Sequence, residues 1–509
     1  MKTFAALLAV LCAGAALPLH AAPLPEPVIA ALKRAHIPLS DVGIVVQAVD
    51  APAPLIAVHA SQPMNPASTM KLLTTYAALE TLGPAYRWKT EAYLDGKLKD
   101  GVLQGNLVFK GYGDPKLTME QFWMWLRELR QRGLRDIRGD VILDHGYFAD
   151  DTGNPATFDR DPTRAYNVSP SALLLNFNAI HVHLIPDGRR TTALIEPQLA
   201  GYTVQNNVAA AARMGCRGGK AVHARLEGNT IRLEGKISAN CGEVDEYYSL
   251  LPHDRYFFSV FGALWKELGG TVEGGLRTGN VPAGLTPFAT YVSPELAQMI
   301  RDINKFSNNI MARQVFLTLG VAGADAPADS GADVAEMQAG GDTAQDEAAS
   351  APAAGALPAT AAAPAGSAAA SAPRSIAWMQ DWLKQEHLQF PELVMENGCG
   401  LSRKARISPL HLAALLQRAA HSPFYPELES SLPILGMDGT VKRRFHDTSL
   451  AGHAHLKTGT LDGVKAVAGY VDAADGRKWI VTFIINGPNA SRGRAAQDAL
   501  IAWVERNGQ

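Results

Sequence analysis

The segment from Asn65 to Leu82 places the tightest limit on the fold, because it predicts a helix that begins with a reactive pair of side chains. Asn65 can cap this helix, Pro66 suits its first position, and an apolar run follows until Gly83-Pro84 ends it. Ser68 and Lys71 lie three residues apart and therefore share one helix face. Backbone N–H groups in the first turn point outward, where the helix dipole is positive. The segment predicts a serine nucleophile with its own base, at a place suited to stabilise an oxyanion.

Two further triplets carry compatible chemistry. Lys457-Thr458-Gly459 occurs once in the chain and falls on an expected strand, so that a cation and a hydroxyl can face a cleft while glycine lets a substrate approach the backbone. Ser307-Asn308-Asn309 lies within an expected helical stretch from 300 to 317. Ser238-Ala239-Asn240 also fits a Ser-x-Asn pattern, but it lies in strand-rich sequence. We therefore favour the motif at Ser307.

The order of expected elements divides the chain into two kinds of sequence. Strand patterns at 464–471 and 479–485, followed by a helix over 491–506, predict an antiparallel sheet covered by helices. A long helix pattern runs from Pro294 to Leu319. Between the Ser68 helix and this long helix, residues 89–286 are rich in strand patterns, most clearly near 180–250. We expect an α+β protein with a discontinuous domain over 22–88 and 287–509, into which strand-rich domains are inserted.

The segment from Val321 to Pro373 has a different composition from the rest. Of its 53 residues, 23 are alanine and seven are acidic, and it contains no basic or aromatic residue. Such a composition cannot supply a hydrophobic core. We expect a disordered surface insertion at 321–373.

The N-terminal 21 residues resemble a secretory signal peptide. Lys2 supplies a positive start, an alanine-rich apolar stretch follows, and Leu19-His20-Ala21 suits signal peptidase cleavage. We expect an exported protein, periplasmic in location, with at most peripheral membrane association. The net charge of -2 and the lack of a long basic block give no support to nucleic-acid binding.

Three cysteines follow the expected signal peptide, and two histidines lie close together in one expected strand. In an exported chain Cys216 and Cys241 could form a disulfide, which leaves Cys399 as an odd thiol that we expect to be a packed small residue. His181 and His183 share one strand face, but no further ligand accompanies them, so we expect them to be structural. No metal site and no cofactor are expected.

Ser-x-x-Lys, Ser-x-Asn and Lys-Thr-Gly in this order are the motifs of serine β-lactamases and penicillin-binding proteins. In finer detail the chain resembles the class C low-molecular-mass penicillin-binding proteins, the D-alanyl-D-alanine carboxypeptidase/endopeptidases. The resemblance covers nearly all of the mature chain except the alanine-rich segment. It is carried by the segments 66–74, 111–115, 396–403, 436–440 and 455–460. That family also places extra domains between its first two motifs and often has a disulfide there, which fits Cys216 and Cys241.

The resemblance implies a role for each motif residue. Ser68 would be acylated, Lys71 would be its base, and Ser307 would pass a proton to the leaving amine. Asn309, Lys457, Thr458, Gly459 and Thr460 would bind the substrate, with backbone N–H groups of Ser68 and Thr460 as the oxyanion hole. Substrates would be peptidoglycan stem peptides and their cross-links, and β-lactams would be covalent inhibitors.

Two other functions use the same features. A β-lactamase or esterase could be built on the same scaffold, and a non-catalytic cell-wall binding protein could keep the fold. The first is disfavoured because no Glu-x-x-Leu-Asn segment was found to activate a deacylating water, and the second because the motifs are intact. Asn176-Phe177-Asn178 stands where some relatives have an acidic residue, which leaves the preferred stem peptide and cross-link open.

Overall fold

The computed structural model describes residues 22–149, 158–187, 190–211, 222–238, 242–322 and 369–507. The expected signal peptide, Cys216 and Cys241 lie outside these residues, so the disulfide stays a prediction.

A five-stranded antiparallel sheet forms the base of the first part of the molecule, in the order β16-β17-β18-β1-β2. Its strands are β1 (Val42–Ala48), β2 (Ile56–Val58), β16 (Ala454–Leu461), β17 (Val464–Asp472) and β18 (Lys478–Asn486). Successive side chains on a strand point to opposite faces, so Ile44 and Val46 enter one hydrophobic core while Val45 enters another. Since both faces are buried, the strands read as continuous apolar runs rather than as alternating ones.

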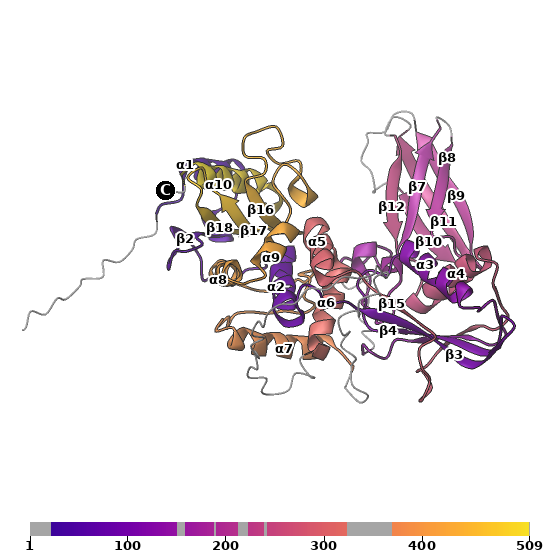
Figure 1. Cartoon of the computed structure of the whole chain (residues 1–509). Coiled ribbons are helices and arrows are strands. Elements are labelled where there is room, and N and C mark those ends of the chain that lie inside the picture. The colour runs from indigo at the N-terminus through magenta and orange to yellow at the C-terminus, as the bar shows by residue number, and fades with distance from the viewer. Residues whose placement is uncertain are drawn as a thin grey trace, which may run out of the picture.

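Helices cover both faces of this sheet (Figure 1). The helices α1 (Glu26–Arg34) and α10 (Arg494–Asn507) pack on one face. On the other face lie α2 (Lys71–Leu82), α5 (Leu296–Phe306), α6 (Asn309–Ala322), α7 (Ala372–Gln385), α8 (Pro409–Ala420) and α9 (Tyr425–Ser431). Every residue of α2 from Lys71 to Leu79 is buried, so this helix lies at the centre of the helical layer.

A strand-rich part is inserted between α2 and α5. A seven-stranded sheet contains β3 (Lys89–Lys99), β4 (Val102–Gly111), β5 (Asp136–Ile137), β6 (Val141–Asp144), β13 (Thr271–Val272), β14 (Leu276–Thr278) and β15 (Ala289–Val292). The helices α3 (Met119–Gln131) and α4 (His253–Glu267) pack against it through a shared hydrophobic core. Because β15 pairs with β3, this sheet extends to Val292, beyond the expected boundary at 286.

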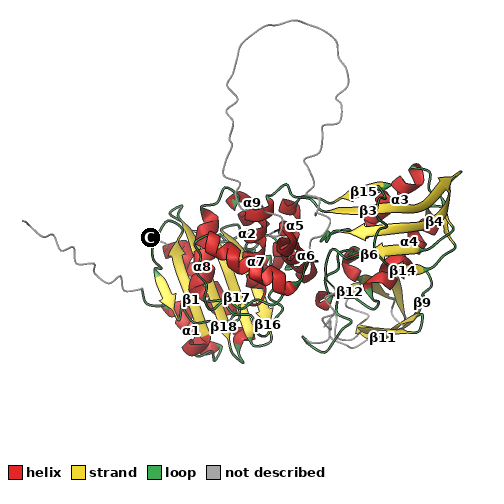
Figure 2. Cartoon of the chain, turned by 90° about the horizontal axis from the view of Figure 1, so that it is seen from below, coloured by secondary structure: helices red, strands yellow, loops and turns green. Residues whose placement is uncertain are grey.

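Two three-stranded sheets complete the inserted part and share that core. One consists of β9 (Thr203–Ala211), β10 (Val222–Glu227) and β11 (Thr230–Ser238), and the other of β7 (Ile180–Pro186), β8 (Thr191–Glu196) and β12 (Val244–Tyr248). In Figures 1 and 2, α5 and α6 lie between the five-stranded sheet and the inserted strands. The second motif therefore stands where the two parts of the molecule meet.

The ordered structure reaches into both ends of the expected insertion. Val321 is buried in α6, and Ala370 is buried and forms a β-bridge with Phe148 before α7 begins. The segment expected to be disordered, 321–373, was thus set too wide at both ends, because Val321 and Ala370 pack against neighbouring residues. Residues 323–368 lie outside the described part of the chain.

Candidate active site

Ser68 stands on a short 3₁₀ turn, not in the first turn of the α-helix as expected. The turn covers Ala67–Met70, and α2 begins at Lys71. Asn65 was expected to cap the helix, but Pro66 holds the cap position of the turn and Met70 that of α2; the Asn65 side chain instead accepts a hydrogen bond from the Ala67 N–H at 2.9 Å, before the turn begins. Ala67 has a φ of +46°, a left-handed conformation that costs a non-glycine residue free energy. The turn therefore places Ser68 in front of α2, directly after a residue in a strained backbone conformation.

Lys71 is wholly buried and has three hydrogen-bond acceptors around its ammonium group. Its Nζ lies 3.1 Å from Ser68 Oγ, 2.7 Å from Asn309 Oδ1 and 2.7 Å from the carbonyl oxygen of Cys399. Burial lowers the pKa of Lys71 to about 8, and the smaller effect of Cys399 opposes this. A neutral amine is therefore accessible near physiological pH, within hydrogen-bond reach of the serine.

The second motif is a junction between two helices rather than part of one long helix. Ser307 follows α5 and has a φ of +58°, which breaks the expected helix from Pro294 to Leu319 into α5 and α6. The break brings Ser307 Oγ to 2.8 Å from Lys457 Nζ, while Asn309 reaches Lys71. The sequence gives no sign of this break, because the apolar pattern of the expected helix continues through it.

Lys457 is the second buried lysine of the site. Burial lowers its pKa well below the usual value, and the positive charge of Lys71 lowers it further. Its Nζ donates to Ser307 Oγ and to the carbonyl oxygen of Thr458, at 3.0 Å for the latter. Since two neighbouring buried cations repel one another, the pair favours a state in which one of them is neutral.

The Lys-Thr-Gly motif lies on β16, the outermost strand of the five-stranded sheet. The Leu456 N–H donates to Pro433 O, away from β17. The backbone N–H groups of successive residues in a strand point alternately to its two edges. The N–H groups of Thr458 and Thr460, two and four residues after Leu456, therefore also point away from β17. This edge offers backbone groups to an added extended peptide.

Gly459 has a packing role that was not expected from the sequence. A Cβ atom at this position would lie 2.6 Å from Pro66 O and 3.0 Å from both Ala67 Cβ and Ser68 N. The missing side chain therefore lets β16 pack directly against the Ser68 turn. It sets the distance between Ser68 and the strand edge, in addition to any space that it opens for a substrate.

The segment around Cys399 packs against the Ser68 turn and α2. The sequence did not predict a role in the site for this segment. Gly398 O accepts from Thr74 Oγ1 at 2.6 Å, and a Cβ at Gly400 would lie 1.9 Å from Ala67 O. Cys399 is a free, fully buried thiol, as expected of a packed residue, and its carbonyl group holds Lys71. The glycines on either side were the available signal that a close approach of backbones occurs here.

A second missed contribution comes from the loop before β16. Thr440 Oγ1 lies 2.8 Å from Thr458 Oγ1, and Asp438 forms an ion pair with Lys305 at 2.7 Å. Lys305 is buried at the end of α5, directly before the second motif. The loop thereby ties β16 to α5.

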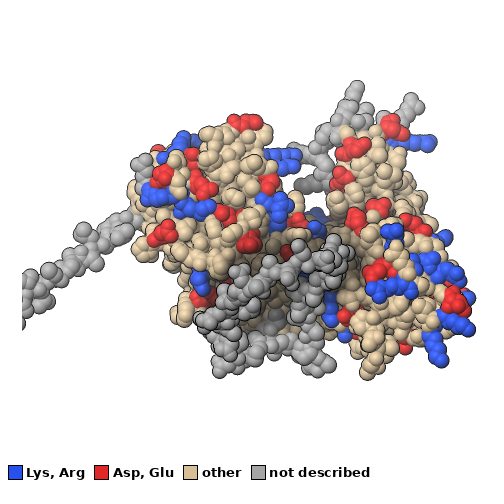
Figure 3. Space-filling model, viewed as in Figure 1, with Lys and Arg blue, Asp and Glu red and all other residues tan. Residues whose placement is uncertain are grey.

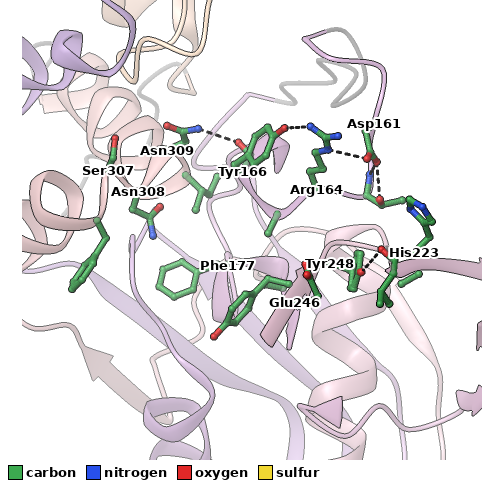
Figure 4. A pocket seen from close by; sticks show the side chains of 18 residues that line it. Asp161, Arg164, Tyr166, Phe177, His223, Glu246, Tyr248, Ser307, Asn308 and Asn309 are labelled. Atoms are coloured by element: carbon green, nitrogen blue, oxygen red, sulfur yellow. Dashed lines mark hydrogen bonds and ion pairs between the residues drawn. The ribbon is translucent and has the colours of Figure 1, made fainter. Parts of the chain in front are cut away.

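A cavity of about 970 Å³ opens beside Ser307 and Asn309 (Figure 4). Its far wall comes from the inserted part and includes Arg164, Tyr166, Glu246 and Tyr248. The Tyr166 carbonyl accepts from Asn309 Nδ2 at 3.3 Å, so the wall touches the site directly. These lining residues were missed because they come from irregular segments and from β12, with no motif of their own.

Charge on the surface is mixed. Figure 3 shows acidic and basic side chains interspersed over one face, in keeping with the net charge of -2. Among the described residues, no helix has the length and apolar character required to cross a membrane.

Known proteins resemble this chain over most of its length. The sequence profile of the "D-Ala-D-Ala carboxypeptidase 3 (S13) family" matches residues 26–339 and 357–507. A D-alanyl-D-alanine carboxypeptidase of an Actinomadura species is 26% identical over 458 residues, 86% of this chain and 76% of the relative. The D-alanyl-D-alanine carboxypeptidase DacB of Haemophilus influenzae is 24% identical over 459 residues, 88% of this chain and 86% of that protein.

Solved structures show the same fold. The crystal structure of penicillin binding protein 4 from Haemophilus influenzae aligns with a TM-score of 0.73 at 20% identity, covering 94% of this chain and 99% of that one. Its complex with a β-lactam aligns with a TM-score of 0.68 at 21% identity, covering 94% and 100%. The expected α+β fold, a helix-covered antiparallel sheet with inserted strand-rich domains, is confirmed, and the match identifies it as β-lactamase/transpeptidase-like.

Proposed function

Because this chain belongs to the D-Ala-D-Ala carboxypeptidase 3 (S13) family of serine peptidases, we propose that Ser68 is its nucleophile and that it acts on peptidoglycan peptides. The substrates would be the D-Ala-D-Ala ends of stem peptides, trimmed by carboxypeptidase action, and the D-amino-acid cross-links, cut by endopeptidase action. The observation that carries the proposal is the buried Lys71 amine, with a pKa of about 8, at 3.1 Å from Ser68 Oγ.

Acylation would begin with neutral Lys71. Its Nζ accepts the proton of Ser68 as Oγ attacks the carbonyl carbon of the scissile peptide bond. The oxyanion would lie between the N–H groups of Ser68 and Thr460; such a donor contributes roughly 10²–10³-fold in rate. The C–N bond then breaks, and the departing amine takes a proton through Ser307, which Lys457 contacts. Water later hydrolyses the ester and restores Ser68.

The substrate would bind as an extended strand on β16. Thr458 and Thr460 offer backbone N–H groups along this edge, and the threonine hydroxyls with Lys457 would receive the terminal carboxylate. The side chain of the acyl donor would enter the cavity beside Asn309, where Arg164 and Glu246 present opposite charges. Such a lining suits a stem residue whose side chain carries polar groups.

Two further proposals concern the cellular location and the inhibitors. We propose a periplasmic location, in agreement with the expected signal peptide, and covalent inhibition by β-lactams, whose strained amide would acylate Ser68. The β-lactam complex of a protein with the same fold supports the second point.

Labelled penicillin tests the assignment. Wild type and a Ser430→Ala control, altered at an exposed serine, should be labelled equally, whereas Ser68→Ala should not be labelled. Labelling of Ser68→Ala at the wild-type level would refute the nucleophile assignment.

Digestion of purified cell-wall fragments tests the substrate. Mass spectrometry should show loss of D-Ala from pentapeptides and conversion of cross-linked dimers to monomers. Release of neither product, together with many-turnover hydrolysis of penicillin, would point to a β-lactamase instead.

A further inference from the structure

The outer face of the sheet formed by β7, β8 and β12 carries a group of imidazole and carboxylate side chains. Along β7, Ile180, Val182 and Leu184 point into the core, so His181 and His183 point outward. The core therefore gives no reason for histidine at either position. From the sequence we expected this pair to be structural, because no further ligand was in view.

The pairing of β7 with β12 supplies the missing ligand. Asp245 lies directly opposite His183 in the register, and its side chain shares the outer face. Asp245 Oδ1 is 2.7 Å from His181 Nε2 and 2.8 Å from His183 Nδ1. Two imidazole nitrogens thus converge on one carboxylate oxygen.

Glu243 occupies the other side of His183. Its Oε2 lies 3.2 Å from His183 Nε2, so both ring nitrogens of this histidine face carboxylates. Carboxylates only accept hydrogen bonds, while a neutral imidazole has one N–H to donate. A neutral ring can therefore satisfy only one of the two contacts, and the other needs either a second ring proton or a metal cation in place of a hydrogen.

We propose that His181 Nε2, His183 Nδ1 and Asp245 Oδ1 bind one divalent transition-metal ion, with Zn²⁺ as the best match. Two imidazoles and one carboxylate favour zinc over Mg²⁺ or Ca²⁺, which prefer oxygen ligands. Ligand bonds of about 2.0–2.2 Å place neighbouring ligand atoms roughly 3.3 Å apart. The two histidine–carboxylate contacts therefore need to open by about 0.5 Å, and the two imidazole nitrogens, which lie within 4.8 Å of one another, need to reach the same separation. The side chains are partly exposed and can make this adjustment.

Neighbouring side chains would hold the two imidazoles in the orientation that a metal ion requires. With Nδ1 on the metal, His183 Nε2–H donates to Glu243, an arrangement that fixes the tautomer of a metal-binding histidine. The ring of Tyr247 stacks on His181 with 4.7 Å between centroids and 13° between planes, which limits rotation of that imidazole. A fourth position would be open to water. The ion would join β12 to β7 outside the active site.

Metal titration of the full protein tests this site. After removal of bound metal and of any affinity tag, isothermal titration with Zn²⁺ should give one equivalent of binding. His183→Ala should weaken the affinity by more than about 100-fold, and Glu243→Gln by about tenfold. His453→Ala, at an exposed histidine elsewhere, is the matched control and should bind as wild type does. Equal binding by wild type and His183→Ala would overturn the proposal.

Two further readouts identify the ligands and the state of the variants. Co²⁺ bound to the wild type should show a visible d–d band without a sulfur-to-cobalt charge-transfer band, and His183→Ala should lose it; a sulfur band would assign the ion to cysteine and overturn the proposal. Labelling of Ser68 by penicillin reports whether each variant is folded, because no ligand of this cluster belongs to the proposed active site. A folded His183→Ala variant with unchanged cobalt spectrum would also refute the site.

Discussion

Replacing Gly459 by alanine should slow acylation of Ser68 without unfolding the protein. The new Cβ would lie 2.6 Å from Pro66 O, whereas ordinary contacts begin near 3.4 Å. The three nearest atoms are two backbone atoms and the Cβ of Ala67, so no flexible side-chain end can move aside. The strand and the Ser68 turn must therefore separate by about 0.8 Å. Misplacement of a reacting group by about 1 Å costs roughly 10²-fold in rate, or about 2.7 kcal/mol of barrier.

The second-order rate of labelling by a fluorescent penicillin measures this effect. Gly275→Ala is the matched control, because a Cβ there has no heavy atom within 4 Å. The control should react at the wild-type rate, and circular dichroism should show that both variants are folded. Acylation of Gly459→Ala within about threefold of wild type would refute the view that glycine sets the position of the serine.

The remaining predictions concern the base, the thiol and the insertion. Since burial lowers the pKa of Lys71 to about 8 and acylation needs its neutral form, the rate should rise with pH below about 8 and level off above it; a rate independent of pH from about 6 to about 9 would exclude Lys71 as the base. Cys399→Ala should acylate within about twofold of wild type, because the carbonyl group at this position, not the thiol, holds Lys71; a loss of labelling with the fold intact would contradict this. Deleting 323–368 should leave penicillin labelling intact, whereas deleting 321–373 should lower the melting temperature by removing buried Val321 and Ala370; equal melting temperatures would show that these contacts add no stability.

The sequence was informative where interacting residues are close together along the chain and where a regular apolar pattern marks a strand or helix. Ser68 and Lys71 share a turn, so their contact follows from spacing alone. The apolar runs of β17 and β18 and the pattern of the last helix likewise indicated a helix-covered sheet. The long interval before Ser307 indicated inserted domains.

Local patterns misled where packing overrode them. The apolar repeat of α5 continues into α6, and only the left-handed conformation of Ser307 separates the two helices. The alanine-rich composition extends over Val321 and Ala370, although neighbouring side chains bury both. In each case a tertiary contact decides the conformation of a residue whose sequence neighbours suggest another.

By itself, the sequence determined that Ser68 and Lys71 lie together, the order of the motifs and the class of fold. The tertiary structure alone decided which distant groups meet: the carbonyl of Cys399 lies 328 residues from Lys71, and Asp245 lies 62 residues from His183. Strand register and helix packing bring these groups together, and neither is encoded in any short stretch of the chain. The lowered pKa of Lys71 has the same origin, because burial is a property of the assembled core.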